Sequence, residues 1–184
     1  QKYLPHIGNN YEFAEMLSEM IGELNVSHAG ARYNRSIPMA DQTAALGIFW
    51  DYKHQGNGLK ITEVISGGPL DKAEFSVKQG MIIQKINGEV ISPEVDFAKL
   101  LNRKVDKFTL LELTDANGAN VQQITVKPIS LGEENRLLYK RWVKKNQEEV
   151  TKLSDGKLGY VHIPGMSDGP YRNVYEDMMG KYHD

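Results

Sequence analysis

The centre of the chain alternates between hydrophobic and polar residues, as half-buried β-strands do. One such run begins at Leu59 and stops at the turn Gly67-Gly68-Pro69, after which a short helical piece is expected over 70–75. A second run, Met81–Ile86, leads into Asn87-Gly88, a pair that tolerates the positive φ angles of a tight hairpin turn. These features predict a small β-rich domain built around residues 59–91.

Further strands and a helix complete this domain. The alternating residues Ala45 to Trp50 predict a first strand. The β-rich runs 108–113 and 121–126 are joined by a second hairpin signal at 115–118. The spacing of apolar residues over 94–102 predicts a helix between these groups of strands.

Helical periodicity dominates on both sides of the domain. Apolar residues recur every three or four positions over 13–24, which predicts an amphipathic helix. A second helix is expected over 133–152, and its cationic stretch 140–145 is interpreted as a solvated face of mixed charge. Residues 158–164 then predict a strand, and 171–178 a further helix.

Composition narrows the classes of function. The 22 basic and 24 acidic residues give a net charge of −2, which provides no electrostatic basis for binding nucleic acid or an anionic membrane. The 184 residues include no cysteine, so thiol catalysis, disulfides and cysteine-bound zinc are excluded. No two histidines have the spacing of a metal site, and no apolar run approaches the roughly 18–20 residues of a membrane-spanning helix. No cofactor or metal is implied.

The order of strand, glycine turn, short helix, strand and Ile86-Asn87-Gly88 resembles the PDZ domains of bacterial and archaeal proteases. Gly80-Met81 departs from the pattern, because these domains usually have Gly-Asp there. The resemblance implies a peptide groove with a carboxylate-binding loop, a strand that pairs with the peptide, and a helix as the opposite wall. The residues assigned to this groove are Leu46, Gly47, Ile48, Phe49, Phe97 and Leu101. The alternation over 46–50 is equally typical of core residues in a first strand, and the two interpretations are compatible.

A second resemblance covers nearly the whole chain. The run Ser154-Asp155-Gly156-Lys157-Leu158-Gly159-Tyr160-Val161-His162-Ile163-Pro164-Gly165-Met166, with Leu138-Tyr139 and Trp142-Val143 before it, resembles the tricorn protease family of serine peptidases. That family places a helical segment ending in Ser-His first, then a PDZ domain, then an α/β catalytic domain. Ser27-His28 lies at the corresponding place, whereas Gly165 replaces an acidic residue that is usual before Met166.

The resemblance assigns roles to Ser27 and His28. His28 is expected to be the general base that activates a serine nucleophile, and Ser27 to hold His28 in the productive tautomer. Without the family context, the pair is only a polar dipeptide after a helix, and a solvated loop histidine is the ordinary interpretation.

The nucleophile itself is not expected in this chain. None of Ser130, Ser154 and Ser167 matches the motif of the family's nucleophile, so the serine is expected beyond Asp184, and the fragment is expected not to cleave. His162 has no matching catalytic role and is interpreted as a structural residue.

The predicted fold class is α+β. Residues 44–130 are expected to form a PDZ-like β-barrel or sandwich with two helices. Residues 1–43 are expected to form an N-terminal helical segment and linker. Residues 131–184 are expected to supply a linking helix and the first β-α unit of an α/β serine-peptidase domain, and both ends of the chain are interpreted as cuts in a longer polypeptide.

Three functions stay open from the sequence. The first is a fragment of a serine endopeptidase that hydrolyses peptides or unfolded polypeptides, with a PDZ domain that binds peptide segments or carboxyl termini. The second is a non-catalytic PDZ binding module. The third is a carboxyl-terminal-processing protease with a serine–lysine dyad, which Ser27-His28 argues against. The expected partners are peptides or unfolded proteins and, since the family forms large assemblies, further copies of the full-length protein. The compartment is not fixed by the sequence.

Overall fold

The chain divides into two compact units. The computed structural model describes residues 2–25 and 27–180, with a first unit up to Ala40 and a second unit from Asp41 onward. The first unit contains the short 3-10 helix η1 (Leu4–His6) and the helix α1 (Asn10–Gly22). Asn9 begins α1, since its side chain accepts hydrogen bonds from two backbone N–H groups of the first turn.

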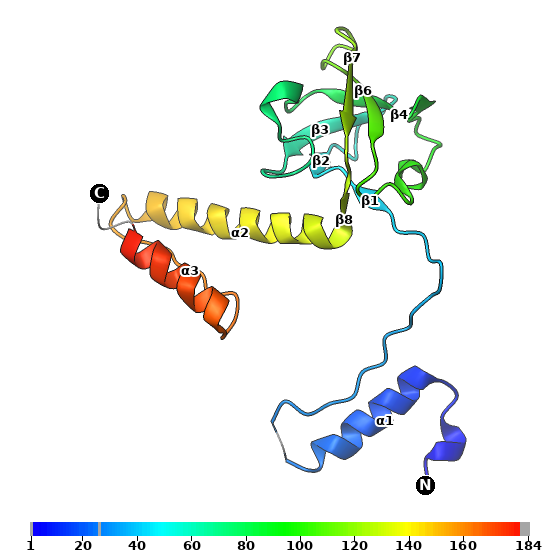
Figure 1. Cartoon of the computed structure of the whole chain (residues 1–184), viewed down its shortest axis with the longest axis vertical. Helices are drawn as coiled ribbons and strands as arrows, with labels where there is room; N and C mark the ends of the chain where they lie inside the picture. The colour runs from blue at the N-terminus through cyan, green and yellow to red at the C-terminus, as the bar shows by residue number, and fades with distance from the viewer. Residues whose placement is uncertain (1, 26, 181–184) are drawn as a thin grey trace. The chain divides into compact units, whose positions relative to one another are not determined.

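The second unit contains two antiparallel sheets (Figure 1). The larger sheet has the strand order β2-β3-β4-β6-β7, with β5 paired to β4, and the smaller sheet consists of β1 and β8. The predicted α+β class is confirmed. Of the two predicted arrangements, a barrel or a sandwich, the closed barrel is not found, because neither sheet closes on itself in the described part of the chain. The strands are β1 (Ala44–Ala45), β2 (Ile48–Trp50), β3 (Leu59–Val64), β4 (Ile82–Ile86), β5 (Glu89–Val90), β6 (Thr109–Thr114), β7 (Gln122–Val126) and β8 (Ile129–Ser130).

Two short 3-10 helices stand where helices were predicted in this domain. They are η2 (Ala73–Phe75) and η3 (Phe97–Leu101), and η3 is shorter than the helix predicted over 94–102. The side chain of Asp96 caps η3 by accepting a hydrogen bond from the Ala98 N–H at 3.1 Å. Short 3-10 turns of this kind serve as connectors between strands.

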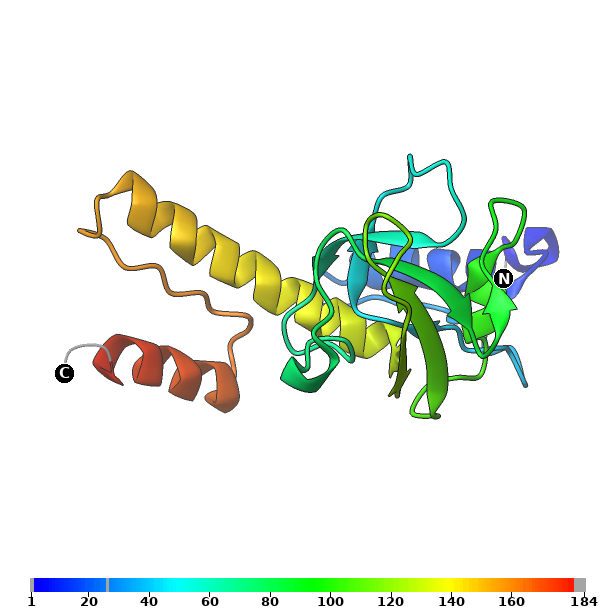
Figure 2. The ribbon, with the colours of Figure 1, turned by 90° about the horizontal axis from the view of Figure 1, so that it is seen from above.

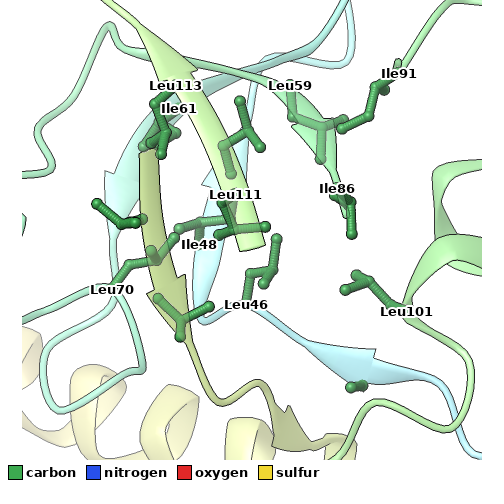
Figure 3. Packing of buried hydrophobic residues seen from close by; sticks show 14 residues of the cluster. Leu46, Ile48, Leu59, Ile61, Leu70, Ile86, Ile91, Leu101, Leu111 and Leu113 are labelled. Atoms are coloured by element: carbon green, nitrogen blue, oxygen red, sulfur yellow. The ribbon is translucent and has the colours of Figure 1, made fainter. Parts of the chain in front are cut away.

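One hydrophobic cluster fills the domain. It contains 14 buried residues, and Figure 3 shows the side chains of Leu46, Ile48 and Leu111 within it. Along β6 the side chains alternate, so that Leu111 and Leu113 are fully buried while Leu110 is 38% exposed. This period of two places one face of the strand on the core, as the hydrophobic pattern predicts.

A long helix leaves the domain directly after β8. The helix α2 (Leu131–Leu153) begins with a capping box, in which the Glu133 N–H donates to Ser130 Oγ and the Ser130 N–H donates to the Glu133 carboxylate. Figure 2 shows its first turns beside the sheet and its last turns extending past it. This helix confirms the one predicted over 133–152.

Arg141 fastens α2 to the sheet. Its guanidinium pairs with both carboxylate oxygens of Glu63 on β3, and it lies over the Phe49 ring, 4.8 Å from the ring centre. This ion pair lowers the pKa of the Glu63 carboxyl. The prediction that the cationic stretch is only a solvated face is therefore wrong for Arg141, because bidentate pairing and ring stacking are contacts that a guanidinium makes on a surface it packs against.

The segment predicted as a strand over 158–164 forms no strand. It follows α2 in an extended conformation, and His162 packs edge-on against the rings of Tyr139 and Trp142, with ring centres 5.4 and 5.1 Å away. Tyr160 accepts a hydrogen bond from the Asn146 amide at 3.3 Å. A β-strand needs a hydrogen-bonded neighbour, and none of the described strands provides one here. The helix α3 (Asp168–Met179) follows where a helix was predicted.

We predict that the core depends on the inward face of β6. Leu111→Ala should lower the free energy of unfolding by about 2–5 kcal/mol, because it leaves a cavity among fully buried side chains. Leu110→Ala, on the outward face of the same strand, is the matched control and should cost less than about 1 kcal/mol. Equal losses for the two variants in urea unfolding would contradict the assigned register.

Candidate functional site

A hollow lies beside β2, between that strand and η3. Its volume is about 170 Å³, and apolar side chains form most of its wall. The residues that line it are Thr43, Ala44, Ala45, Leu46, Ile48, Trp50, Leu59, Phe97, Ala98, Leu101, Leu131 and Glu134. Four parts of the fold thus contribute: the β1–β2 region, the start of β3 through Leu59, η3, and the first turn of α2. We call this hollow the β2 groove.

The strand β2 offers its free edge to this groove. It is the edge strand of the larger sheet and pairs only with β3 among the described strands. Toward β3, the Gly47 carbonyl accepts from the Ile65 N–H at 2.9 Å, and the Asp51 N–H donates to the Lys60 carbonyl at 2.8 Å. Alternate residues of an antiparallel strand direct their backbone groups to opposite edges, so those of Ile48 and Trp50 lie on the open edge. An extended peptide can add to such an edge as a further strand.

The loop before β2 is fixed by Gly47. Its φ angle is +66°, in the left-handed region, and a Cβ at this position would lie 2.9 Å from Cδ of Pro69. A larger residue would therefore meet both backbone strain and a clash. Glycine is required here for the loop to pass the turn at 67–69 that follows β3.

Glu134 is the charged residue of the groove. It lies in the first turn of α2, where it lines the groove beside Leu131. Burial raises the pKa of the Glu134 carboxyl. The groove thus has a mostly apolar wall with one carboxyl group, at the start of α2.

Trp50 and Phe97 face each other across the groove. Their ring centres are 5.3 Å apart with the planes at 80°, an edge-to-face contact between β2 and η3. Phe49 lies on the opposite face of β2, where it packs against Arg141, and it does not line the groove. Alternation along the strand accounts for this difference.

The residues predicted for the groove are mostly brought together. Leu46, Ile48, Phe97 and Leu101 line it, and Gly47 forms the loop at its end. Sequence reasoning missed Trp50, which it assigned to the core of a first strand, and Ala98. It also missed Leu131 and Glu134, because nothing in the spacing of α2 shows that its first turn lines the groove.

Ser27 and His28 lie in the first unit, in the turn after α1. Both side chains are exposed, and His28 has a left-handed backbone with a φ angle of 62°. The chain is tied back to α1 by the Ser18 hydroxyl, which donates to the Ala31 carbonyl at 2.7 Å and accepts from the Ala31 N–H at 2.8 Å. His28 therefore lies in a short stretch of chain between the end of α1 and Ala31, which Ser18 anchors to that helix.

Neither residue is engaged in the described part of the chain. No hydrogen bond or ion pair between described residues involves Ser27 or His28, so their side chains are open to solvent or to another surface. Residues 2–25 and 27–180 contain no group of three His, Cys, Asp or Glu side chains placed to hold a metal ion. Among the same residues, no helix has both the length and the apolar character needed to cross a membrane.

Comparison with known proteins finds tricorn protease relatives for the domain that carries the β2 groove and for the segment that carries Ser27 and His28. Residues 45–130 match the family described as the tricorn protease PDZ domain. The whole chain is 29% identical to a tricorn protease homolog of Saccharolobus solfataricus, and 95% of it is 25% identical to tricorn protease homolog 1 of Streptomyces coelicolor. The chain spans about a sixth of the length of these curated relatives, since it covers 17% of each.

A solved structure has the same fold. The crystal structure of the tricorn protease aligns with 95% of this chain at a TM-score of 0.74 and 21% identity, using 17% of its own chain. The arrangement of open sheets and helices described above is therefore one that occurs in that protease.

We predict that the charge of Glu134 costs stability at neutral pH. Its folded pKa is raised above the ordinary 4.5, so the cost is fully present above the raised pKa and shrinks as the pH falls from there to 4.5. It disappears below pH 4.5, where the group becomes protonated in both the folded and the unfolded state. Glu134→Gln should raise the melting temperature by roughly 1–4 °C at pH 7 and by less near pH 4.

Glu149→Gln, an exposed position on the same helix, is the matched control and should leave the melting temperature unchanged. The pH profile should be recorded by circular dichroism for the unchanged protein and for both variants. A Glu134→Gln variant that melts lower than the unchanged protein at pH 7 would contradict the assignment.

Proposed function

From the match of residues 45–130 to the tricorn protease PDZ domain family, we propose that the β2 groove binds an extended peptide segment and that the full-length protein is a serine peptidase. The proposal has two parts. The first is peptide binding by the second unit, and the second is general-base catalysis by His28 in the full-length protein.

The open edge of β2 supports the first part. An added strand would hydrogen-bond to the backbone groups of Ile48 and Trp50, and this recognition does not depend on the peptide's sequence. Side chains on one face of that peptide would enter the apolar wall formed by Leu46, Phe97 and Leu101. A polypeptide that is extended and exposes apolar side chains fits such a site. Unfolded proteins and peptides have both properties.

The placement of His28 supports the second part. A serine hydroxyl is a weak nucleophile until a base takes its proton, and a histidine can return that proton to the leaving amine. His28 is exposed on a turn that Ser18 anchors, so its ring is available to a serine from another part of the protein. We place that serine outside the 184 residues, as the sequence motifs indicate, and we assign Ser27 to orienting His28.

A binding-only function is the second candidate, and one observation favours it. The groove and the proposed base lie in separate units, and no serine of the nucleophile motif is present in the sequence. The 184-residue chain by itself is therefore proposed to bind peptides without cleaving them. In the full-length protein, copies of the chain are proposed to assemble, as in the wider family.

We predict that blocking the groove abolishes peptide binding. Blocked decapeptides with alternating apolar residues should shift the amide signals of Leu46–Phe49 in NMR spectra at concentrations up to about 1 mM. Ala98→Phe should remove these shifts, because its ring would occupy the groove, whereas Lys99→Phe at the neighbouring exposed position should keep them. Shifts that survive Ala98→Phe, or that never appear, would refute groove binding.

We predict that His28 is essential for peptide hydrolysis by the full-length protein. His28→Ala should lower kcat/KM on a fluorogenic peptide by about 10⁴-fold or more, since the serine loses its base. His6→Ala in the same unit is the control and should hydrolyse normally. Turnover that persists in the His28→Ala protein, with folding shown to be intact, would exclude the base assignment.

A further inference from the structure

We infer that the chain has a second binding surface, along the basic side of α2, and that its ligand is an acidic peptide segment. This surface lies between α2 and the turn that follows β3. It shares no lining residue with the β2 groove, so the inference does not depend on peptide binding there.

Two hollows adjoin along α2. The larger has a volume of about 480 Å³ and lies between the middle of α2 and the end of β3 with its turn. The smaller, of about 240 Å³, continues toward the start of the helix, and both are lined by Gly67, Leu137 and Lys140. We call the two hollows together the α2 groove. From Arg136 to Lys145 it follows the helix for about 13.5 Å, at roughly 1.5 Å per residue, which is the length of about four residues of an extended chain.

Basic side chains outnumber acidic ones in the α2 groove. The basic residues that line it are Arg136, Lys140, Arg141, Lys144 and Lys145. The acidic residues that line it are Glu63, Glu133 and Glu148. Five positive and three negative charges leave a local charge of +2, although the whole chain has a net charge of −2. The average composition therefore conceals a site with an attraction for anions.

The acidic residues of the groove each have a basic partner. Glu63 pairs with Arg141. Glu133 lies 3.6 Å from Arg136, and Glu148 lies 3.8 Å from Lys144.

Lys140 and Lys145 carry the remaining charges. Both are exposed, and neither forms an ion pair or a side-chain hydrogen bond with another described residue. The α2 groove thus has two ammonium groups with no anion of the described chain to bind.

This arrangement is unfavourable for an isolated helix. Lys140 lies four residues after Arg136 and four before Lys144, and Lys145 lies four after Arg141. Like charges at this spacing are neighbours on the helix surface and destabilise it. A ligand that brings carboxylates to the two free lysines relieves this repulsion.

The spacing and the walls of the groove fit an extended peptide with acidic residues at alternate positions. Lys140 and Lys145 are separated by about 7.5 Å along the helix axis. Alternate side chains of an extended chain are about 6.6 Å apart and lie on one face, so flexible lysine side chains reach both carboxylates. Val64 and Leu137 are half-buried in the wall and give the peptide apolar contacts, and the exposed Ser66 adds a hydroxyl donor.

The groove is less suited to nucleic acid, the other common polyanion. A phosphate backbone carries a charge at every nucleotide and would meet the three glutamates as well as the lysines. No aromatic side chain lines the α2 groove on which a base could stack. A segment with two carboxylates needs only the two free ammonium groups.

The test uses an acetylated and amidated heptapeptide with glutamate at its third and fifth positions, and the same peptide with glutamine at both. Each is titrated at pH 7 and about 50 mM salt into the 184-residue chain, with amide signals followed by NMR. The test variant combines Lys140→Gln with Lys145→Gln. The matched control combines Lys152→Gln with Lys157→Gln, which removes the same charge from exposed positions outside both grooves. Circular dichroism verifies the fold of each variant.

The glutamate peptide should shift the amide signals of Ser66 and Gly67 and bind about fivefold more tightly than the glutamine peptide, or better. The test variant should lose at least about fivefold in affinity for it, the control should stay within about twofold, and about 0.5 M salt should remove the preference.

Equal binding of the two peptides, or an affinity that the test variant retains, would overturn the inference. So would an absence of shifts, or shifts confined to Leu46–Phe49, which would place the peptide in the β2 groove. Tighter binding of an oligothymidylate of about twelve nucleotides, lost in the test variant, would assign the α2 groove to nucleic acid and also overturn it. The β2 groove is tested by its own peptides and stands or falls separately.

Discussion

The pairing of β1 with β8 is the constraint on which the site depends. Ala44 aligns with Ser130 and Ala45 with Ile129, so the two ends of the domain meet in one short sheet. Because β8 runs directly into α2, this pairing delivers the first turn of the helix to the loop before β2. A second tie reinforces it, since the Thr43 hydroxyl donates to the Asn102 side chain at 2.6 Å and brings η3 to the same place. The groove is thus a junction of four segments: the β1–β2 region, the start of β3, η3 and the start of α2.

This junction gives the groove its chemistry as well as its shape. The sheet supplies a backbone edge, η3 supplies an apolar wall, and α2 supplies the one carboxylate. A PDZ domain that ended at residue 130 would have the first two and would lack this carboxylate. The helix that follows the domain therefore forms part of the groove's wall and supplies its one ionisable side chain.

The sequence predicted the turns and the alternation of buried and exposed residues, and it did not predict which distant segments pack together. Asn87-Gly88 and the alternation along β6 predict a hairpin and a buried face because both signals arise from neighbouring residues. The sequence left a barrel and a sandwich both open, and the strand over 158–164 was wrong, because closure and strand pairing depend on partners that local spacing does not reveal. Arg141 was taken for a solvent-facing cation for the same reason, since its partners Glu63 and Phe49 lie 78 and 92 positions earlier in the chain. Glu134 was missed because only the β1–β8 pairing brings the start of α2 to the groove.

The length of α2 has a mechanical consequence. Its 23 residues form a rod of about 35 Å, at roughly 1.5 Å per residue, with the loop before β2 near its first turn and His162 packed near its middle, against Tyr139 and Trp142. If the rod pivots at its first turn, a tilt of about 5° moves its far end by about 3 Å, by the same length. The contacts of Arg141 with Glu63 and Phe49 lie a little under halfway along α2, and they resist such a tilt. A small movement of the first turn of α2 is therefore either resisted by the Arg141 contacts or amplified at the far end of the helix.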